Sequence, residues 1–347
     1  MHMADALLSP GVGAAFWAGT LVAIGYASKK LKETIDDKMV PLMGVLGAFI
    51  LASQMINFTI PGTGSSGHLG GGMILTILLG PPAAFLVMAS VLTVQALFFA
   101  DGGLLALGCN IWNLGIYPCF IAFPFIYTPL AGDGKNTTRV LFAALASGVI
   151  GLQLGAFSVV LETLFSGKSE LPFGTFLMLM LPIHLGIGLV EGFVTAGVIN
   201  YVRSVRPEIL ESVVSARPLP AGVSMKNVLV GLAILAIITG GTISWFASTR
   251  PDGLEWSIEK VFGKPELPEQ EHGIVPALRA IQEKIAFLPD YNFKPEKKEK
   301  ESAAKSPPSW PNVELGTSLS GILGALIVFG LSLMIGFGIK VIRGRQS

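Results

Sequence analysis

The chain has 347 residues, of which 51% are hydrophobic and 14% charged, and its formal net charge is +1. Several apolar stretches exceed the roughly 18 residues that a helix needs to span a bilayer. The composition therefore indicates an all-α, polytopic membrane protein in contact with the lipid bilayer. It disfavours a β-barrel, because the apolar runs are continuous rather than alternating. Net charge alone says nothing about partners, and we expect no nucleic-acid ligand.

Nine membrane-spanning helices are expected along the chain. A long apolar region is interrupted by the motifs GPP and DGG, and glycine and proline are the residues that most often break helices. The expected spans, in chain order, are 11–28, 39–57, a short helix near 69–80, 81–100, 104–130, 139–165, 173–201, 226–246 and 317–340. The short helix rises only about 18 Å, which is tolerated where protein surrounds it or where it lines a cavity.

Four short basic segments set the orientation of these helices. They are 29–38, 132–139, 203–218 and 340–347, and the positive-inside rule places all four in the cytoplasm. Because the first two segments both lie in the cytoplasm, an even number of spans must separate them. The span 39–57 is one of these, so the region 58–131 must cross the membrane an odd number of times. Dividing its apolar stretch at GPP gives three crossings, whereas leaving it undivided gives two. We therefore expect a multi-pass protein of the cell membrane with an extracytoplasmic N-terminus and a cytoplasmic C-terminus.

The composition also divides the chain into parts. Residues 1–202 form a seven-helix core, and 203–225, which is rich in proline and arginine, reads as a cytoplasmic linker. Residues 226–347 form a two-helix accessory module with a large extracytoplasmic loop, 247–314. In that loop an amphipathic helix is expected, because apolar side chains recur at helical spacing at Ile274, Leu278, Ile281 and Ile285. The charged stretch 294–308 is predicted to be disordered.

Histidine is scarce, and His2 and His68 are both expected on the outer side. His2 is one residue from the chain start, and His68 lies in PGTGSSGHLGGG, at 61–72. Glycine allows such a loop to approach a ligand closely, so the loop is a candidate for presenting His68. A phosphate-binding loop is excluded because no GK[ST] follows, whereas a plain flexible loop remains an alternative.

A histidine at the second position allows a particular chelate. The amine of Met1, the amide nitrogen of His2 and the Nδ1 atom of His2 can bind one ion through a five-membered and a six-membered ring. A second histidine would complete a square of nitrogens, a geometry typical of Ni(II) or Cu(II). The amide must lose its proton, so binding should release protons and weaken at low pH. The alternative is an exposed histidine that binds nothing.

These same residues carry a family resemblance. The start MHMADALLSP resembles the MHIPDGFL-type start of the nickel/cobalt substrate-binding (S) components of energy-coupling-factor (ECF) importers, the CbiM/NikM family. The likeness continues through GSSGHLGGG, LLGPPAAFLVMASVLTVQALFFADGG and LGCNIWNLGIYP and covers 1–202. The stretch STRPDGLEWS, at 248–257, resembles the PDGLE-type accessory module of the same systems, which appears here as a fusion.

The resemblance implies a function, a ligand set and partners. Such a protein captures Ni(II), or Co(II), as transported substrate and hands it over in complex with a transmembrane coupling (T) subunit and cytoplasmic ATPase (A) subunits. The family's ligands correspond to Met1, His2 and His68 of this chain. The start departs from the family pattern, although Asp5 is near the expected acidic position, and the departure leaves the nickel or cobalt preference open.

Other polar residues in the spans have two interpretations. His184 and Glu191 share a helix face, and a buried hydrogen-bonded pair is favoured over a release path, because buried polar groups normally find partners. Gln95, Asn110 and Asn113 either support the site or link helices. Two further groups are expected to be inert, namely a solvated His272 and the packing residues Cys109 and Cys119.

The preferred function is an S-component for nickel uptake, and it is not an enzyme. No Walker motif is present, so partner subunits must supply the energy. A cobalt-specific S-component is the first alternative. An intramembrane metalloenzyme would need a zinc site with an open position and a general base, as in H-E-x-x-H, and the sequence places no carboxylate beside His2 or His68. A passive channel would conduct without ATPase partners.

Overall fold

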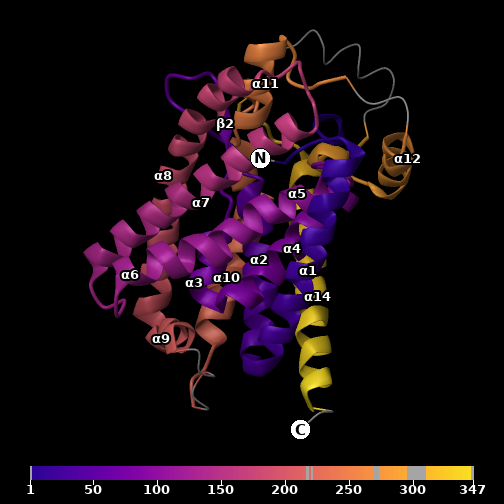
Figure 1. The fold of residues 1–347 in the computed structure, drawn as a ribbon. Coiled ribbons are helices and arrows are strands. Elements are labelled where there is room, and N and C mark those ends of the chain that lie inside the picture. Colours follow the sequence, from indigo (N-terminus) through magenta and orange to yellow (C-terminus); the bar gives the residue numbers. More distant parts are fainter. Residues whose placement is uncertain (1, 216–218, 220–221, 269–272, 295–309, 345–347) are drawn as a thin grey trace.

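The protein folds almost entirely into helices, as the computed structural model shows (Figure 1). The structure describes residues 2–215, 219, 222–268, 273–294 and 310–344. Met1, His272 and nearly all of the predicted disordered segment lie outside the described residues. Within the described part, six helices are long and apolar enough to cross a membrane. The expected all-α, polytopic membrane fold is confirmed.

Every span expected in the core contains a helix. The elements are α1 (Pro10–Thr34), α2 (Met39–Gln54), α3 (Gly72–Leu79), α4 (Pro81–Phe98), the continuous run of α5 (Leu107–Ile111), η2 (Trp112–Tyr127) and α6 (Thr128–Ala131), then α7 (Thr137–Phe165) and α8 (Phe173–Val205). The GPP motif breaks the chain as expected, because Gly80 has φ 78° and the following proline begins α4. All eight residues of the short helix α3 are buried, so protein surrounds it.

The rest of the chain contributes further helices. The linker contains α9 (Pro207–Ser215), and the accessory module contains α10 (Lys226–Gly241), η3 (Ile243–Phe246), α11 (Gly253–Phe262), α12 (Val275–Ile285), η4 (Pro289–Tyr291) and α14 (Leu315–Gly344). The predicted amphipathic helix is therefore confirmed as α12. The expected linker is less open than its composition suggests, because α8 runs into it and α9 follows directly, packed against α8 and α3.

Glycines allow the accessory helices to pack closely on each other and on the core. Both α10 and α14 lie against α2. Gly240 of α10 and Gly321 of α14 meet backbone to backbone, since a Cβ atom added to Gly240 would lie 3.1 Å from the Cα atom of Gly321. On the core side, Gly44 of α2 leaves room for the ring of Phe329 on α14. Small residues at such crossings are typical of helix pairs in lipid.

The extended segments gather at one end of the helical assembly. Figure 1 shows α11, α12 and β2 toward one end, and α9 with the last turns of α14 toward the other. Strands β1 (Phe58–Thr59) and β2 (Ser66–Gly67) pair antiparallel. Strand β2 lies within the glycine-rich stretch 61–72, and His68 follows it directly, so the hairpin fixes where His68 is presented.

Candidate metal centre

The first residues of the chain are pinned inside the protein. The backbone N–H of Met3 donates to Asn110 Oδ1 at 2.8 Å, and Asn110 Nδ2 donates to the Met3 carbonyl at 3.3 Å. The N–H of Gly103 also donates to that carbonyl, at 2.9 Å. The side chain of Asp5, in the short helix η1 (Asp5–Leu7), accepts the backbone N–H of Ala106 at 2.9 Å. These contacts hold the His2 side chain in a position where only 7% of it is exposed.

The glycine-rich loop presents His68 with one nitrogen fixed and one available. The Nδ1 atom bonds to the Leu69 carbonyl at 2.9 Å, so Nδ1 carries the hydrogen and Nε2 the lone pair. The Nε2 atom is buried and has no hydrogen-bond partner among the described residues. Gly71, with φ 77°, turns the chain into α3 immediately afterwards. This is the arrangement in which an imidazole serves as a metal ligand through Nε2.

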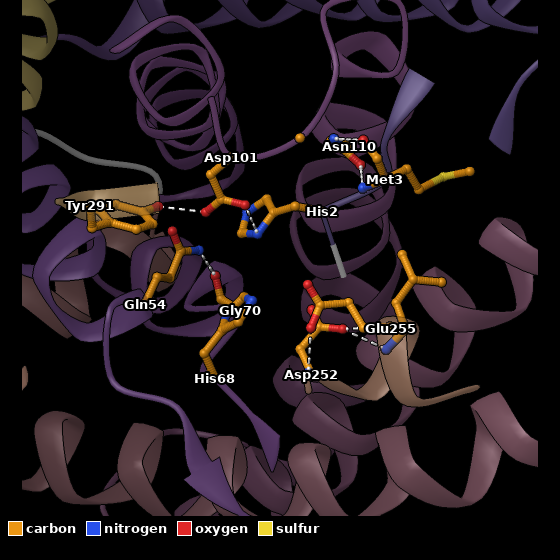
Figure 2. Close-up of polar contacts among 12 residues, drawn as sticks. His2, Met3, Gln54, His68, Gly70, Asp101, Asn110, Asp252, Glu255 and Tyr291 are labelled. Carbon is orange, nitrogen blue, oxygen red and sulfur yellow. Dashed lines mark hydrogen bonds and ion pairs between the residues drawn. The ribbon is translucent and has the colours of Figure 1, made fainter. Parts of the chain in front are cut away.

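The two predicted imidazoles come together although 66 positions separate them. The rings of His2 and His68 are stacked, with centroids 5.0 Å apart and planes at 13° (Figure 2). Burial lowers the pKa of each imidazole to about 3, because desolvation disfavours the charged form. Both rings are therefore neutral at ordinary pH, as metal ligation requires. Met1, the third predicted ligand residue, lies outside the described residues.

Carboxylates that sequence analysis missed line the same cavity. It has a volume of about 520 Å³, and both imidazoles border it. Asp101 Oδ1 lies 3.2 Å from His2 Nδ1. The accessory region contributes further lining residues, among them Asp252, Glu255, Asp290 and Tyr291. No sequence proximity links these residues to either histidine, although the DGG motif that carries Asp101 did stand out as a break between spans.

The accessory chain runs along the hairpin that precedes His68. The N–H of Ser66 donates to the Pro251 carbonyl at 2.8 Å, and the Ser66 hydroxyl donates to the Arg250 carbonyl at 2.8 Å. Directly after this contact, Asp252 caps α11 by accepting the N–H groups of Leu254 and Glu255. The PDGLE motif thus positions an acidic helix cap on the wall of the cavity.

His184 and Glu191 do not pair with each other, so the favoured interpretation was wrong. His184 Nδ1 bonds to the Met180 carbonyl at 2.7 Å. Glu191 instead accepts the N–H groups of Gly70 and Gly71, at 2.7 and 3.3 Å. The glycine-rich loop has fixed donors to satisfy, and the buried carboxylate meets that need. Glu191 therefore supports the loop that carries His68.

The three polar residues weighed for supporting roles behave differently. Asn110 holds the N-terminal segment, whereas Asn113 donates to Glu162 of α7 at 3.0 Å and so links helices. The side chain of Gln95 is buried in α4, and the backbone carbonyl of Gln95 accepts the N–H of Asp101 at 3.1 Å. Both cysteines are buried and free, which agrees with packing roles.

Side chains alone do not form a metal cluster in the part of the chain that the structure describes. There, no three His, Cys, Asp or Glu side chains are grouped so that they could hold an ion. Ions of the first transition row are commonly held by four or more donors. A site built on His2 and His68 would therefore need further donors, and backbone nitrogens at the chain start are the nearest candidates in sequence.

Comparisons with known proteins agree with the resemblance. Residues 2–209 match the family model for the cobalt uptake substrate-specific transmembrane region, and residues 226–341 match the PDGLE domain. The chain is 38% identical, over 61% of its length and 68% of the relative's, to a protein from Archaeoglobus fulgidus named a putative fused nickel transport protein. It is 29% identical to the fused nickel transport protein of Rhodobacter capsulatus, with 97% of both chains covered.

The fold of the core also occurs in a solved structure. A crystal structure described as a transition metal transporter is 29% identical, with a TM-score of 0.53, and the match covers 60% of this chain and 95% of that one. The family model covers more than half of the chain, and the relatives are named as transport proteins rather than enzymes. The chain therefore belongs to the family of cobalt uptake substrate-specific transmembrane regions, carries a PDGLE domain behind it, and is a membrane component of nickel or cobalt transport.

Proposed function

We propose that this protein captures Ni(II) at the extracytoplasmic end of the cavity and delivers it for import driven by ATP. The observation that carries the proposal is the juxtaposition of two buried, neutral imidazoles, one of them at the second residue of the chain. Neutral imidazoles are good ligands for late first-row ions. The ion is the transported substrate, and the protein binds and releases it unchanged.

The proposed ligands are four nitrogens. Met1 would supply its amine, His2 its amide nitrogen and Nδ1, and His68 its Nε2. Two features support this set. The hydrogen bond from His68 Nδ1 to a carbonyl leaves Nε2 as the available ligand, and the pinned segment around Met3 holds His2 next to His68. Four nitrogens in one plane suit Ni(II).

Nickel is favoured over cobalt on chemical grounds. Ni(II) promotes loss of the amide proton better than Co(II), and the proposed set includes a deprotonated amide. The two fused relatives described above are both named for nickel transport, although the family description names cobalt. A cobalt-specific component remains the alternative, and competition between Ni(II) and Co(II) at matched concentrations would separate the two.

Delivery requires other subunits. The sequence has no Walker motif, so we propose a transmembrane coupling subunit and cytoplasmic ATPase subunits of the ECF type as partners. The four basic segments support the proposed orientation, with an extracytoplasmic N-terminus and a cytoplasmic C-terminus. The carboxylates around the cavity would attract a divalent cation, but they form no zinc motif, so the metalloenzyme alternative gains no support from them.

Four glycines added before Met1 test the proposed ligand set. The extension carries the amine too far from His2 to share a chelate with its amide and Nδ1, so nickel binding should fall almost completely. A single added glycine is avoided, because a histidine at the third position can form its own four-nitrogen chelate. Binding is measured on the purified full chain by titration against a competing chelator, together with the absorption of square-planar Ni(II). Four glycines added after Ser347 are the matched control and should leave binding unchanged. If the N-terminal extension binds nickel like the wild type, the terminal amine is not a ligand.

A further inference from the structure

Asp101 connects the accessory module to His2. The Asp101 Oδ1 atom lies 3.2 Å from His2 Nδ1, and the hydroxyl of Tyr291 donates to Asp101 Oδ2 at 2.5 Å. Figure 2 shows Asp101 between the tyrosine and the imidazole, with a contact to each. The two carboxylate oxygens thus face two different modules of the chain.

Tyr291 is held firmly against the segment that carries Asp101. Its ring stacks on Phe99, with centroids 4.8 Å apart and planes at 20°. The preceding residue, Asp290, donates its N–H to the Phe99 carbonyl at 2.8 Å. From α12, Gln282 donates to the carbonyls of Ala96 and Gly102, at 2.8 and 2.7 Å. The hydrogen bond to Asp101 is therefore part of a docked interface.

Backbone geometry also singles out this segment. Ala100, next to Asp101, has φ 54°, a left-handed conformation that is strained for a residue with a Cβ atom. The hydrogen bond from the N–H of Asp101 to the carbonyl of Gln95 helps to maintain the turn. A strained backbone residue therefore directly precedes Asp101, whose side chain contacts His2.

The contact on His2 occupies the nitrogen that the proposed chelate needs. Nδ1 can keep its 3.2 Å contact with the Asp101 carboxylate or give its lone pair to a metal ion, but not both. We propose that Tyr291 and Asp101 form a latch on His2. Asp101 competes with the metal ion for Nδ1 of His2. Tyr291 is a positioning residue, because its hydroxyl donates to the same carboxylate and thereby weakens the hold of Asp101 on His2. This inference rests on the proposed chelate.

The latch predicts opposite effects for two conservative substitutions. In Asp101→Asn a neutral amide replaces the carboxylate, and hydrogen bonds to a neutral acceptor are about half as strong. His2 is then released more easily, and nickel should bind about threefold tighter. In Tyr291→Phe the carboxylate loses its second donor and holds His2 more strongly, so nickel should bind about threefold more weakly.

The experiment measures nickel affinity in the full chain for both variants and for the double variant. Because Tyr291 acts through Asp101, adding Tyr291→Phe to Asp101→Asn should change nothing further. Asp290→Asn is the matched control for charge, since it removes one carboxylate from the wall of the same cavity, and that carboxylate makes neither the contact with His2 nor the hydrogen bond from Tyr291. The Asp101→Asn affinity is compared with this control, and thermal unfolding of each variant verifies that it folds.

The outcomes separate the latch from the chelate. Opposite shifts of the two single variants, with no added effect in the double variant, support the latch. Shifts in the same direction, an unchanged Tyr291→Phe, or additive effects in the double variant overturn it. If the four-glycine N-terminal extension leaves nickel binding intact, the chelate itself fails. If that extension abolishes binding but the two variants shift alike, only the latch fails.

Discussion

The two imidazoles of the site are held by two regions that work differently. His68 lies in a glycine-rich loop, and a backbone carbonyl fixes its Nδ1, which leaves Nε2 available. His2 lies on the N-terminal segment, and its Nδ1 faces the carboxylate of Asp101, which Tyr291 also contacts. One prospective ligand nitrogen is thus free in the structure, and the other is engaged by a side chain.

The difference teaches how recognition can be divided between two ligands. A carbonyl partner belongs to the backbone, so no neighbouring side chain can alter it, and His68 is organised in advance. Preorganisation of this kind lowers the cost of binding. The carboxylate on His2 responds to its other partners, so the accessory module gains influence over binding through one residue. One ligand, His68, is thus held in place in advance, and the other, His2, depends on the contacts of Asp101. Such a combination suits a protein that must both capture and release an ion.

Removing the fixed ligand is expected to have the largest effect. His68→Ala deletes a proposed ligand outright, so nickel affinity should fall by more than the roughly 10- to 100-fold that an outer-shell contact is worth. The measurement is a chelator-competition titration of the full chain. His272→Ala provides the same substitution in the charged loop and should bind nickel like the wild type. Equal losses in the two variants would refute the role of His68.

The pH dependence should come from the chain start rather than from the imidazoles. Burial lowers the pKa of both rings to about 3, so neither carries a proton to displace near neutral pH. The amine, whose pKa is ordinarily about 7.7 to 8, and the amide must each lose a proton. Nickel affinity should therefore fall about 100-fold for each unit of pH lowered between roughly pH 7 and 5. A dependence of three or four protons would mean that the imidazoles are protonated, contrary to their burial.

The sequence predicted the local features well and the distant ones poorly. The short α3, the break at Gly80 and the helix α12 follow from glycine, proline and apolar spacing, which act over a few residues. The pairing of His2 with His68 came from coordination chemistry and family resemblance. The contacts of Asp101 with Tyr291 and of Glu191 with Gly70 join segments more than 100 positions apart. Such contacts depend on how the helices pack, so no local sequence pattern predicts them.

The hold on the N-terminal segment can be weakened without touching a proposed ligand. Asn110→Ala removes both side-chain hydrogen bonds to Met3, so the chain start becomes less ordered and nickel affinity should fall about tenfold, near the lower end of outer-shell effects. Ser158→Ala is the control, because its buried hydroxyl donates to Glu162 rather than to the N-terminal segment. Both variants should unfold at lower temperature, but only the first should lose affinity. A loss shared by both would mean that general destabilisation, not the position of Met3, sets the affinity.

The hold on the His68 loop by the accessory chain should show the smallest effect. Ser66→Ala deletes the hydroxyl that donates to the Arg250 carbonyl, yet the backbone hydrogen bond to Pro251 remains. One neutral hydrogen bond contributes about 1 kcal/mol, and the loop keeps its other anchors, so nickel affinity should fall about twofold to threefold. Ser65→Ala is the control, since that hydroxyl bonds to Thr63 within the hairpin. If the two variants bind nickel equally well, the accessory chain does not hold His68 in place, and its influence on the site must pass through His2 alone.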